Sequence, residues 1–205
     1  MSPIRSSTVL ACAVALTALT GCPSGPSTSV VRTNPNAQVD LSGNWNDTDA
    51  NQVAAAMIRD CLTRPWTSKF KAEKGRDPVV KLYPIRNRSS EHINTKFYTK
   101  QVEMELLNSG AVKVVAALEE AGDARYEKME QSVHASDETA KQHQKETGTD
   151  FLLNGWIVSQ NDAVDGQEVR AYVTTMELIN AETQEKVWIK VHQIKKVITR
   201  QGSQW

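Results

Sequence analysis

Long apolar segments are scarce in this chain of 205 residues. The longest, Val9–Leu19, spans about a dozen residues, whereas a helix that crosses a bilayer needs roughly 20. No second apolar segment of comparable length follows, and the sequence has no internal repeat. A transmembrane helix and a repeat architecture are therefore not expected.

The first 22 residues have the layout of a bacterial secretory signal. Arg5 precedes the apolar segment, and Leu19-Thr20-Gly21-Cys22 follows it with small residues that suit cleavage. This tetrapeptide resembles the lipobox of bacterial lipoproteins, in which the cysteine is lipidated and becomes the new N-terminus. Several acyl chains, such as palmitate, anchor a protein more firmly than a single chain does. The alternative is an ordinary cleaved signal in which Cys22 stands by chance.

A tether follows the predicted lipidation site. Pro23–Asp40 is rich in Pro, Ser, Thr, Asn and Gly, and it has too few apolar groups to offset the entropy of ordering. Pro23, and not Asp, follows the cysteine. By resemblance to the sorting rule of Gram-negative bacteria, this favours the outer membrane. We expect residues 1–21 to be the signal, 22–40 the lipidated cysteine and disordered tether, and 41–205 one globular domain.

Cysteine is also scarce, with three residues in the chain. Cys12 would leave with the signal and Cys22 would carry lipid, so Cys61 would be the one free thiol. A single thiol cannot form an intramolecular disulfide. Cys61 fits a nucleophile or a core residue, and we favour the core because Val53, Met57 and Cys61 recur every four residues.

Neither sign of charge is in excess. The chain carries 24 basic and 24 acidic side chains, and removal of residues 1–21 takes away one base, Arg5, which leaves 23 against 24. A general nucleic-acid-binding protein would have a basic surplus, so no nucleic-acid partner is expected.

Helical signals occur at four places. Asp49 and Gln52 have the spacing of a capping box, an apolar series with a helical period follows, and Pro65 ends this first helix. Trp45, just before it, fits a ligand-stacking residue or a plug at the edge of the core, and we favour the plug. The other predicted helices are Thr95–Ser109, which Gly110 ends in the C′ position, Asp123–His134 and Ser136–Thr147.

Five segments have the pattern of strands: Pro78–Ile85, Ala111–Ala116, Phe151–Ser159, Val169–Asn180 and Glu185–Thr199. The first two flank a helix, which predicts a βαβ unit with parallel strands. Turn signals at Asp165-Gly166 and at Ala181–Gln184 predict that the last three strands form an antiparallel meander. The expected fold class is α/β (α+β), with a mixed sheet of four or five strands flanked by helices.

Catalytic motifs are missing from the sequence. G-x-S-x-G, H-E-x-x-H, C-x-x-C and phosphate-binding glycine loops do not occur. Solvated histidines are favoured over a shared metal site, because the four are scattered: His92, His134, His143 and His192. Glu119-Glu120 fits a charged loop or helix start better than an acid–base pair. We predict no catalytic residue, no metal site and no cofactor, and a protein that is not an enzyme.

The last predicted strand has two different faces. One face carries Val187, Ile189 and Val191. The other carries Trp188 among cations, namely Lys186, Lys190 and His192, with Lys195 and Lys196 beyond. Trp and cations favour interface hot spots, so this face fits a docking surface. Lysines also protect edge strands against aggregation, and this interpretation fits at least as well.

Several segments together resemble the LpoB family of outer-membrane lipoproteins. DLSGNWNDTDANQVAAAMI at Asp40–Ile58 is similar to the start of the family's domain. NRSSEHINT at Asn87–Thr95 precedes a helix and LLNSGAVKVV, and ETGTDFLLNGWI at Glu146–Ile157 resembles the family's G-x-D-x-x-L-x-G-like pattern. The resemblance covers the whole domain in order, with a lipobox ahead of it.

The resemblance implies a protein that is not an enzyme and whose domain is similar to the N-terminal domain of TolB. Family members reach from the outer membrane through the peptidoglycan. They bind a docking domain of a class A penicillin-binding protein and stimulate its glycan polymerisation and peptide crosslinking. Cys22 alone is carried over as a site residue, for lipid attachment, and the partner-binding residues are not placed.

From this resemblance we expect a lipid-anchored monomer whose domain faces the periplasm. The predicted tether, Pro23–Asp40, is considerably shorter than that of the best-known family members. A structural or trafficking lipoprotein with a TolB-like domain, in an envelope-spanning assembly, is the alternative function.

Overall fold

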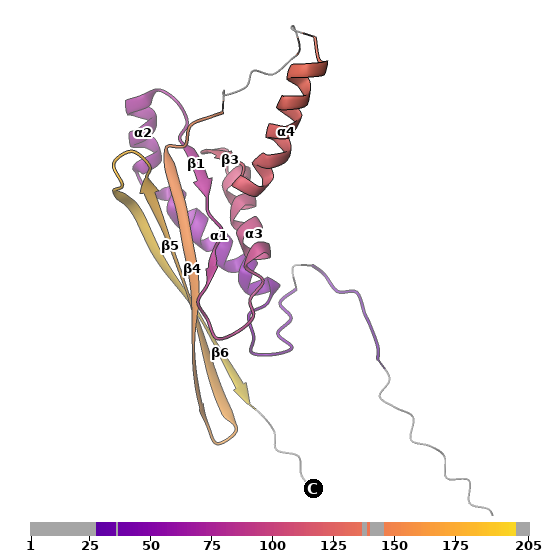
Figure 1. Ribbon diagram of the computed structural model, residues 1–205. Helices are drawn as coiled ribbons and strands as arrows, with labels where there is room; N and C mark the ends of the chain where they lie inside the picture. The colour runs from indigo at the N-terminus through magenta and orange to yellow at the C-terminus, as the bar shows by residue number, and fades with distance from the viewer. Residues whose placement is uncertain (1–27, 36, 137–138, 140–145, 200–205) are drawn as a thin grey trace, which may run out of the picture. The chain divides into compact units, whose positions relative to one another are not determined.

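Helices and short strands are interspersed through the first part of the domain, and three long strands form its last part. The computed structural model describes residues 28–35, 37–136, 139 and 146–199 (Figure 1). The elements in chain order are α1 (Asp47–Thr63), α2 (Trp66–Lys74), β1 (Val79–Leu82), β2 (Arg86–Asn87), α3 (Thr95–Asn108), β3 (Lys113–Val115), α4 (Leu118–His134), β4 (Phe151–Val164), β5 (Gln167–Asn180) and β6 (Lys186–Thr199). Residues 28–35 contain no helix or strand.

The strands form one mixed sheet, which confirms the predicted fold class. Its order is β3-β1-β4-β5-β6, and β2 pairs with β4 beside this path. β1 is parallel to both β3 and β4, and β4, β5 and β6 are antiparallel. The parallel βαβ unit and the closing meander are therefore confirmed. The short strand β2, which the sequence did not predict, adds a sixth strand.

Helix α1 starts earlier than predicted. Its capping box uses Asn46 as the N-cap: the Asn46 side chain accepts from the Asp49 amide at 3.0 Å, and Asp49 accepts from the Asn46 amide at 2.9 Å. The predicted box of Asp49 and Gln52 is wrong, because the upstream asparagine caps the helix and Asp49 serves as its third residue. The end of the helix before Pro65 is confirmed, and its buried face includes Val53, Met57 and Cys61.

A second helix, α2, was not predicted. It begins directly after Pro65 and ends at Gly75, whose φ of 66° is a left-handed conformation suited to glycine. Trp66 and Phe70 are buried on α2, and their rings lie 4.9 and 5.4 Å from the ring of Phe151 between centroids. This aromatic cluster holds α2 against the start of β4.

The two later helices differ in how well they are packed. α3 has nearly the predicted bounds, and Gly110 follows it with a φ of 63°. α4 starts five residues before the predicted Asp123, and none of its side chains from Glu120 to His134 is buried. Figure 1 shows α4 running away from the sheet. The predicted helix at Ser136–Thr147 lies largely outside the described residues.

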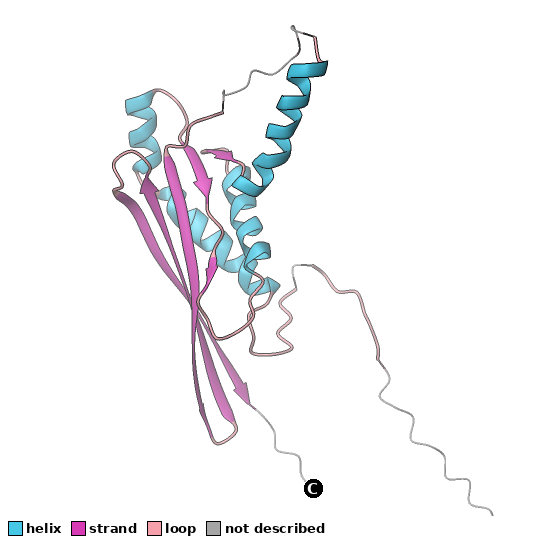
Figure 2. Cartoon of the chain, in the orientation of Figure 1, coloured by secondary structure: helices cyan, strands magenta, loops and turns pink. Residues whose placement is uncertain are grey.

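The core lies between one face of the sheet and the helices α1 and α3, which Figure 2 shows on the same side of the strands. Tyr98, Val102 and Leu106 of α3 are fully buried there, as are Leu153 and Met176 of the sheet. Residues of β6 alternate between this covered face and the opposite, open face. Strand β4 runs five residues beyond the predicted Ser159, because its polar second half pairs with β5 without any apolar pattern.

Within the described ranges, no helix combines the length and the apolar character needed to cross a membrane.

Candidate functional site where the tether meets strand β6

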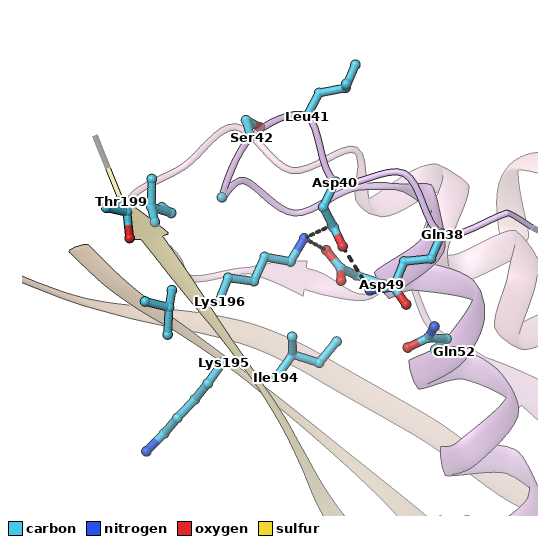
Figure 3. A pocket seen from close by; sticks show the side chains of 13 residues that line it. Gln38, Asp40, Leu41, Ser42, Asp49, Gln52, Ile194, Lys195, Lys196 and Thr199 are labelled. Atoms are coloured by element: carbon cyan, nitrogen blue, oxygen red, sulfur yellow. Dashed lines mark hydrogen bonds and ion pairs between the residues drawn. The ribbon is translucent and has the colours of Figure 1, made fainter. Parts of the chain in front are cut away.

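A groove of about 460 Å³ lies where the chain enters the domain. We call it the junction groove (Figure 3). It is lined by Gln38 and Asp40–Gly43, by Asp49 and Gln52 of α1, and by residues Ile194–Thr199 of β6. The first and last segments of the domain, more than 150 positions apart in the sequence, thus form its two walls.

Lys196 joins these walls. The alternation of β6 directs its side chain toward α1, and its Nζ lies 2.9 Å from Asp40, 2.6 Å from Asp49 and 3.0 Å from the carbonyl oxygen of Asn44. The hydrogen bond from Lys196 holds the pKa of Asp40 down at about 2, with help from Gln38 and Asn46. Burial lowers the pKa of Lys196, but the bonds to Asp40 and Asp49 outweigh it, so the pKa is raised. Asp40 and Lys196 are therefore ionised at neutral pH.

A second set of contacts holds the same segment against β5. The Tyr172 hydroxyl lies 2.8 and 2.7 Å from the carboxylate oxygens of Glu91 and 3.0 Å from the carbonyl oxygen of Gly43. Burial raises the pKa of Tyr172, and the Glu91 carboxylate raises it further, so the hydroxyl keeps its proton. Arg170 donates to both Glu91 and Asn44. The chain is thus fixed to β5 and to β6 before α1 begins.

Trp45 and Gly43 complete this segment. The Trp45 ring packs edge-on against Tyr98 and Tyr172, at 5.7 and 5.6 Å between centroids, and contacts the core cluster. This confirms its predicted place as a plug at the core edge. A Cβ at position 43 would overlap the side chain of Ile198, so glycine allows the segment to approach β6 closely.

Trp188, the residue that suggested a docking surface, faces the helices. It is 6% exposed, and its indole nitrogen donates to Asp60 of α1 at 2.9 Å. Lys190 lies 3.2 Å from the same carboxylate. Hydrogen bonds from Arg64 and then from Trp188 lower the pKa of Asp60. The covered face of β6 is therefore a packing face, which supports the structural alternative for Trp188.

Replacement of Trp188 by Ala should destabilise the domain by about 3 kcal/mol, because it leaves a cavity and removes the donor to Asp60. Thermal unfolding measured by circular dichroism tests this. Trp188→Phe keeps most of the ring and should lose less than half as much. An unchanged unfolding midpoint in Trp188→Ala would contradict the packing role.

The other residues considered from the sequence do not form a shared site in the described part of the chain. Cys61 is buried on α1 as predicted, and burial raises the pKa of its thiol to about 12, so it is a poor nucleophile. His92 and His134 are exposed, and His192 is partly buried on β6. Across the described ranges no group of three or more His, Cys, Asp or Glu side chains could hold a metal. Cys22 and His143 lie outside those ranges.

The junction groove has a mixed polar and aliphatic lining. Lys196 pairs with the carboxylates of Asp40 and Asp49, and the remaining lining consists of Lys195, amides, hydroxyls and aliphatic side chains. Sequence reasoning did not single out this groove. Lys196 was noted only as a cation near the end of a strand, and Glu91 only as the neighbour of a histidine.

The domain is an α+β fold with a mixed sheet, helices α1 and α3 on one face and a polar groove beside strand β6. The profile of the family described as peptidoglycan-synthase activator LpoB matches residues 49–194. This match covers most of the chain, which belongs to the LpoB family.

Solved structures with similarity to the chain include the C-terminal domain of LpoB from Escherichia coli, at 17% identity and a TM-score of 0.44, covering 72% of this chain and 99% of that one. A lipoprotein from Neisseria meningitidis has 16% identity and a TM-score of 0.37, with 62% and 88% covered. The PelC dodecamer from Paraburkholderia phytofirmans has 18% identity and a TM-score of 0.34, with 61% and 75% covered. A comparison with curated proteins gives no significant match.

Proposed function

We propose that this protein is an outer-membrane lipoprotein that binds a class A penicillin-binding protein and activates its synthesis of peptidoglycan. The observation that carries the proposal is the family match over residues 49–194, from the first turn of α1 to the second half of β6. The family is described as an activator of peptidoglycan synthases, so the protein would act on the synthase and not on its substrate.

Activation requires that the domain bind the active form of the synthase more tightly than the inactive form. A ligand with equal affinity for both forms shifts no equilibrium. A tenfold stimulation corresponds to about 1.4 kcal/mol of difference in binding free energy, which a few well-packed contacts can supply. A modest interface therefore suffices.

The anchor and the domain have separate roles in this proposal. Cys22 would carry the lipid, and residues 23–40 would set how far the domain reaches into the periplasm. The segment Asp40–Asn46 is fixed to β5 and β6, so the tether would leave the domain at one defined place, beside the junction groove.

The test is stimulation of glycan polymerisation. The mature chain, residues 22–205 with Cys22→Ser to avoid lipidation, should raise the polymerisation rate of a class A synthase from the same organism several-fold. The same synthase without its docking domain is the matched control and should not respond. Absence of both binding and stimulation with every class A synthase of that organism would refute the proposal.

A further inference from the structure

Strand β6 is an edge of the sheet along its full length of 14 residues. One side of it pairs with β5 from Lys186 to Thr199. On its other side, the backbone of β6 makes no hydrogen bond to any described residue. Such a row of unpaired amides and carbonyls is a template on which another extended chain can add as a strand.

The lysines of β6 do little to prevent another strand from pairing with this edge, because most of them are neutralised by carboxylates within the chain. Lys190 pairs with Asp60 and Lys196 with Asp40 and Asp49, all on the covered face. Lys186 pairs with Glu177 at 2.7 Å. Lys195 differs: it is exposed, points to the open face and has no carboxylate partner among the described residues.

The open face of β6 carries exposed aliphatic side chains at Ile189, Val191 and Val197, and its exposed polar residues are Gln193, Lys195 and Thr199. Ile189 and Val191 are 57% and 54% exposed, although both are large aliphatic side chains in a well-formed strand. Val197 beyond Lys195 is exposed as well. An added strand would bury these side chains and would meet one unpaired positive charge. The junction groove lies along the same strand from Ile194 to Thr199, so the edge continues into a cavity.

We propose that β6 binds an extended segment of the partner synthase as an added strand, with apolar side chains beside Ile189 and Val191 and a carboxylate beside Lys195. This inference rests on the proposed function for the identity of the partner. A second copy of the chain fits less well, because residues 186–199 contain no Asp or Glu to pair with Lys195. The required chemistry is that of an alternating apolar strand with at least one acidic residue.

Hydrogen exchange and a charge reversal test this proposal with the mature Cys22→Ser chain and the synthase ectodomain. The amides of β6 that face away from β5 should exchange at least tenfold more slowly in the complex. Lys195→Glu should weaken binding about tenfold at low salt and leave the melting temperature unchanged. Lys113→Glu, at an exposed lysine of β3 on the opposite edge of the sheet, is the matched control and should bind as the wild type does.

Three results would overturn the inference. The first is a complex in which β6 amides exchange as in the free protein. The second is equal binding by Lys195→Glu and Lys113→Glu. The third is protection of β6 by self-association without the synthase, which light scattering would detect. If the wild-type chain stimulates the synthase and any of these results is obtained, strand addition is refuted and the proposed function stands. If the wild-type chain neither binds nor stimulates the synthase, the proposed function itself is refuted.

Discussion

Replacing Lys196 by Met should lower the free energy of unfolding by about 4 kcal/mol, because removal of one partner from a buried ion pair leaves an uncompensated charge. The Asp49 side chain is 7% exposed and that of Lys196 is 11% exposed, so water cannot take the place of the missing cation. For a domain of this size the unfolding midpoint should fall by about 10 °C. Asp40, which is more exposed, contributes the smaller part of the loss.

Two further variants make this result specific. Lys195→Met changes the neighbouring lysine, which is exposed and faces the other way, and should shift the midpoint by less than 2 °C. Lys196→Met combined with Asp49→Asn removes the orphaned charge and should recover part of the loss. If the melting temperature of Lys196→Met lies within 1 °C of that of the wild type, the ion pairs of Lys196 with Asp40 and Asp49 stabilise the domain no more than a surface ion pair does. The segment Asp40–Asn46 is then held by other contacts.

Cys22→Ser should abolish the activity of the protein in cells and leave its domain folded. The proposed anchor depends on this thiol, and without the lipid the domain would diffuse away from the membrane that sets its position. Residues 36–205 cluster as one unit, separate from residues 1–35, so the change should not affect packing of the domain. The measurement is rescue of peptidoglycan synthesis in cells that lack the native gene.

Pro23→Ala is the matched control for this prediction, because it changes the adjacent residue and keeps the thiol. It should rescue as the wild type does. Fractionation should place the wild type and Pro23→Ala in the outer membrane and Cys22→Ser in the soluble periplasm. Full rescue by soluble Cys22→Ser protein would show that the anchor is dispensable and that the domain alone carries the function.

The fold was largely predictable from the sequence because its main elements repeat apolar residues with clear periods. The meander was predictable from turn signals: Asp165 and Gly166 both have positive φ, 46° and 78°, as a two-residue hairpin turn requires. Helix α2 was missed because Trp66 and Phe70 give one short apolar contact rather than a repeated stripe. Strand β2 was missed because its two exposed polar residues owe their conformation to pairing with Trp156 and Ile157.

The candidate site was much less predictable than the fold. Lys196 and Asp40 are brought together by the complete sheet, and no local pattern connects positions 156 residues apart. The alternation of β6 was read correctly, but periodicity alone does not say which face a helix covers. The hydrogen bond from Trp188 to Asp60 shows that α1 covers the face of β6 that carries Trp188. The face that carries Ile189 and Val191 is therefore the exposed one.

The contact between Lys196 and Asp40 has a mechanical consequence for an anchored protein. In the proposed anchored protein, tension from the membrane would enter the domain at Asp40–Asn46 and would pass at once to the last two strands of the sheet, through Lys196 of β6 and Tyr172 of β5. Helix α1, which follows directly, is then shielded from the load. A pull that would otherwise unwind the domain from its N-terminal side must first break the contacts that join Asp40 to Lys196 and Gly43 to Tyr172.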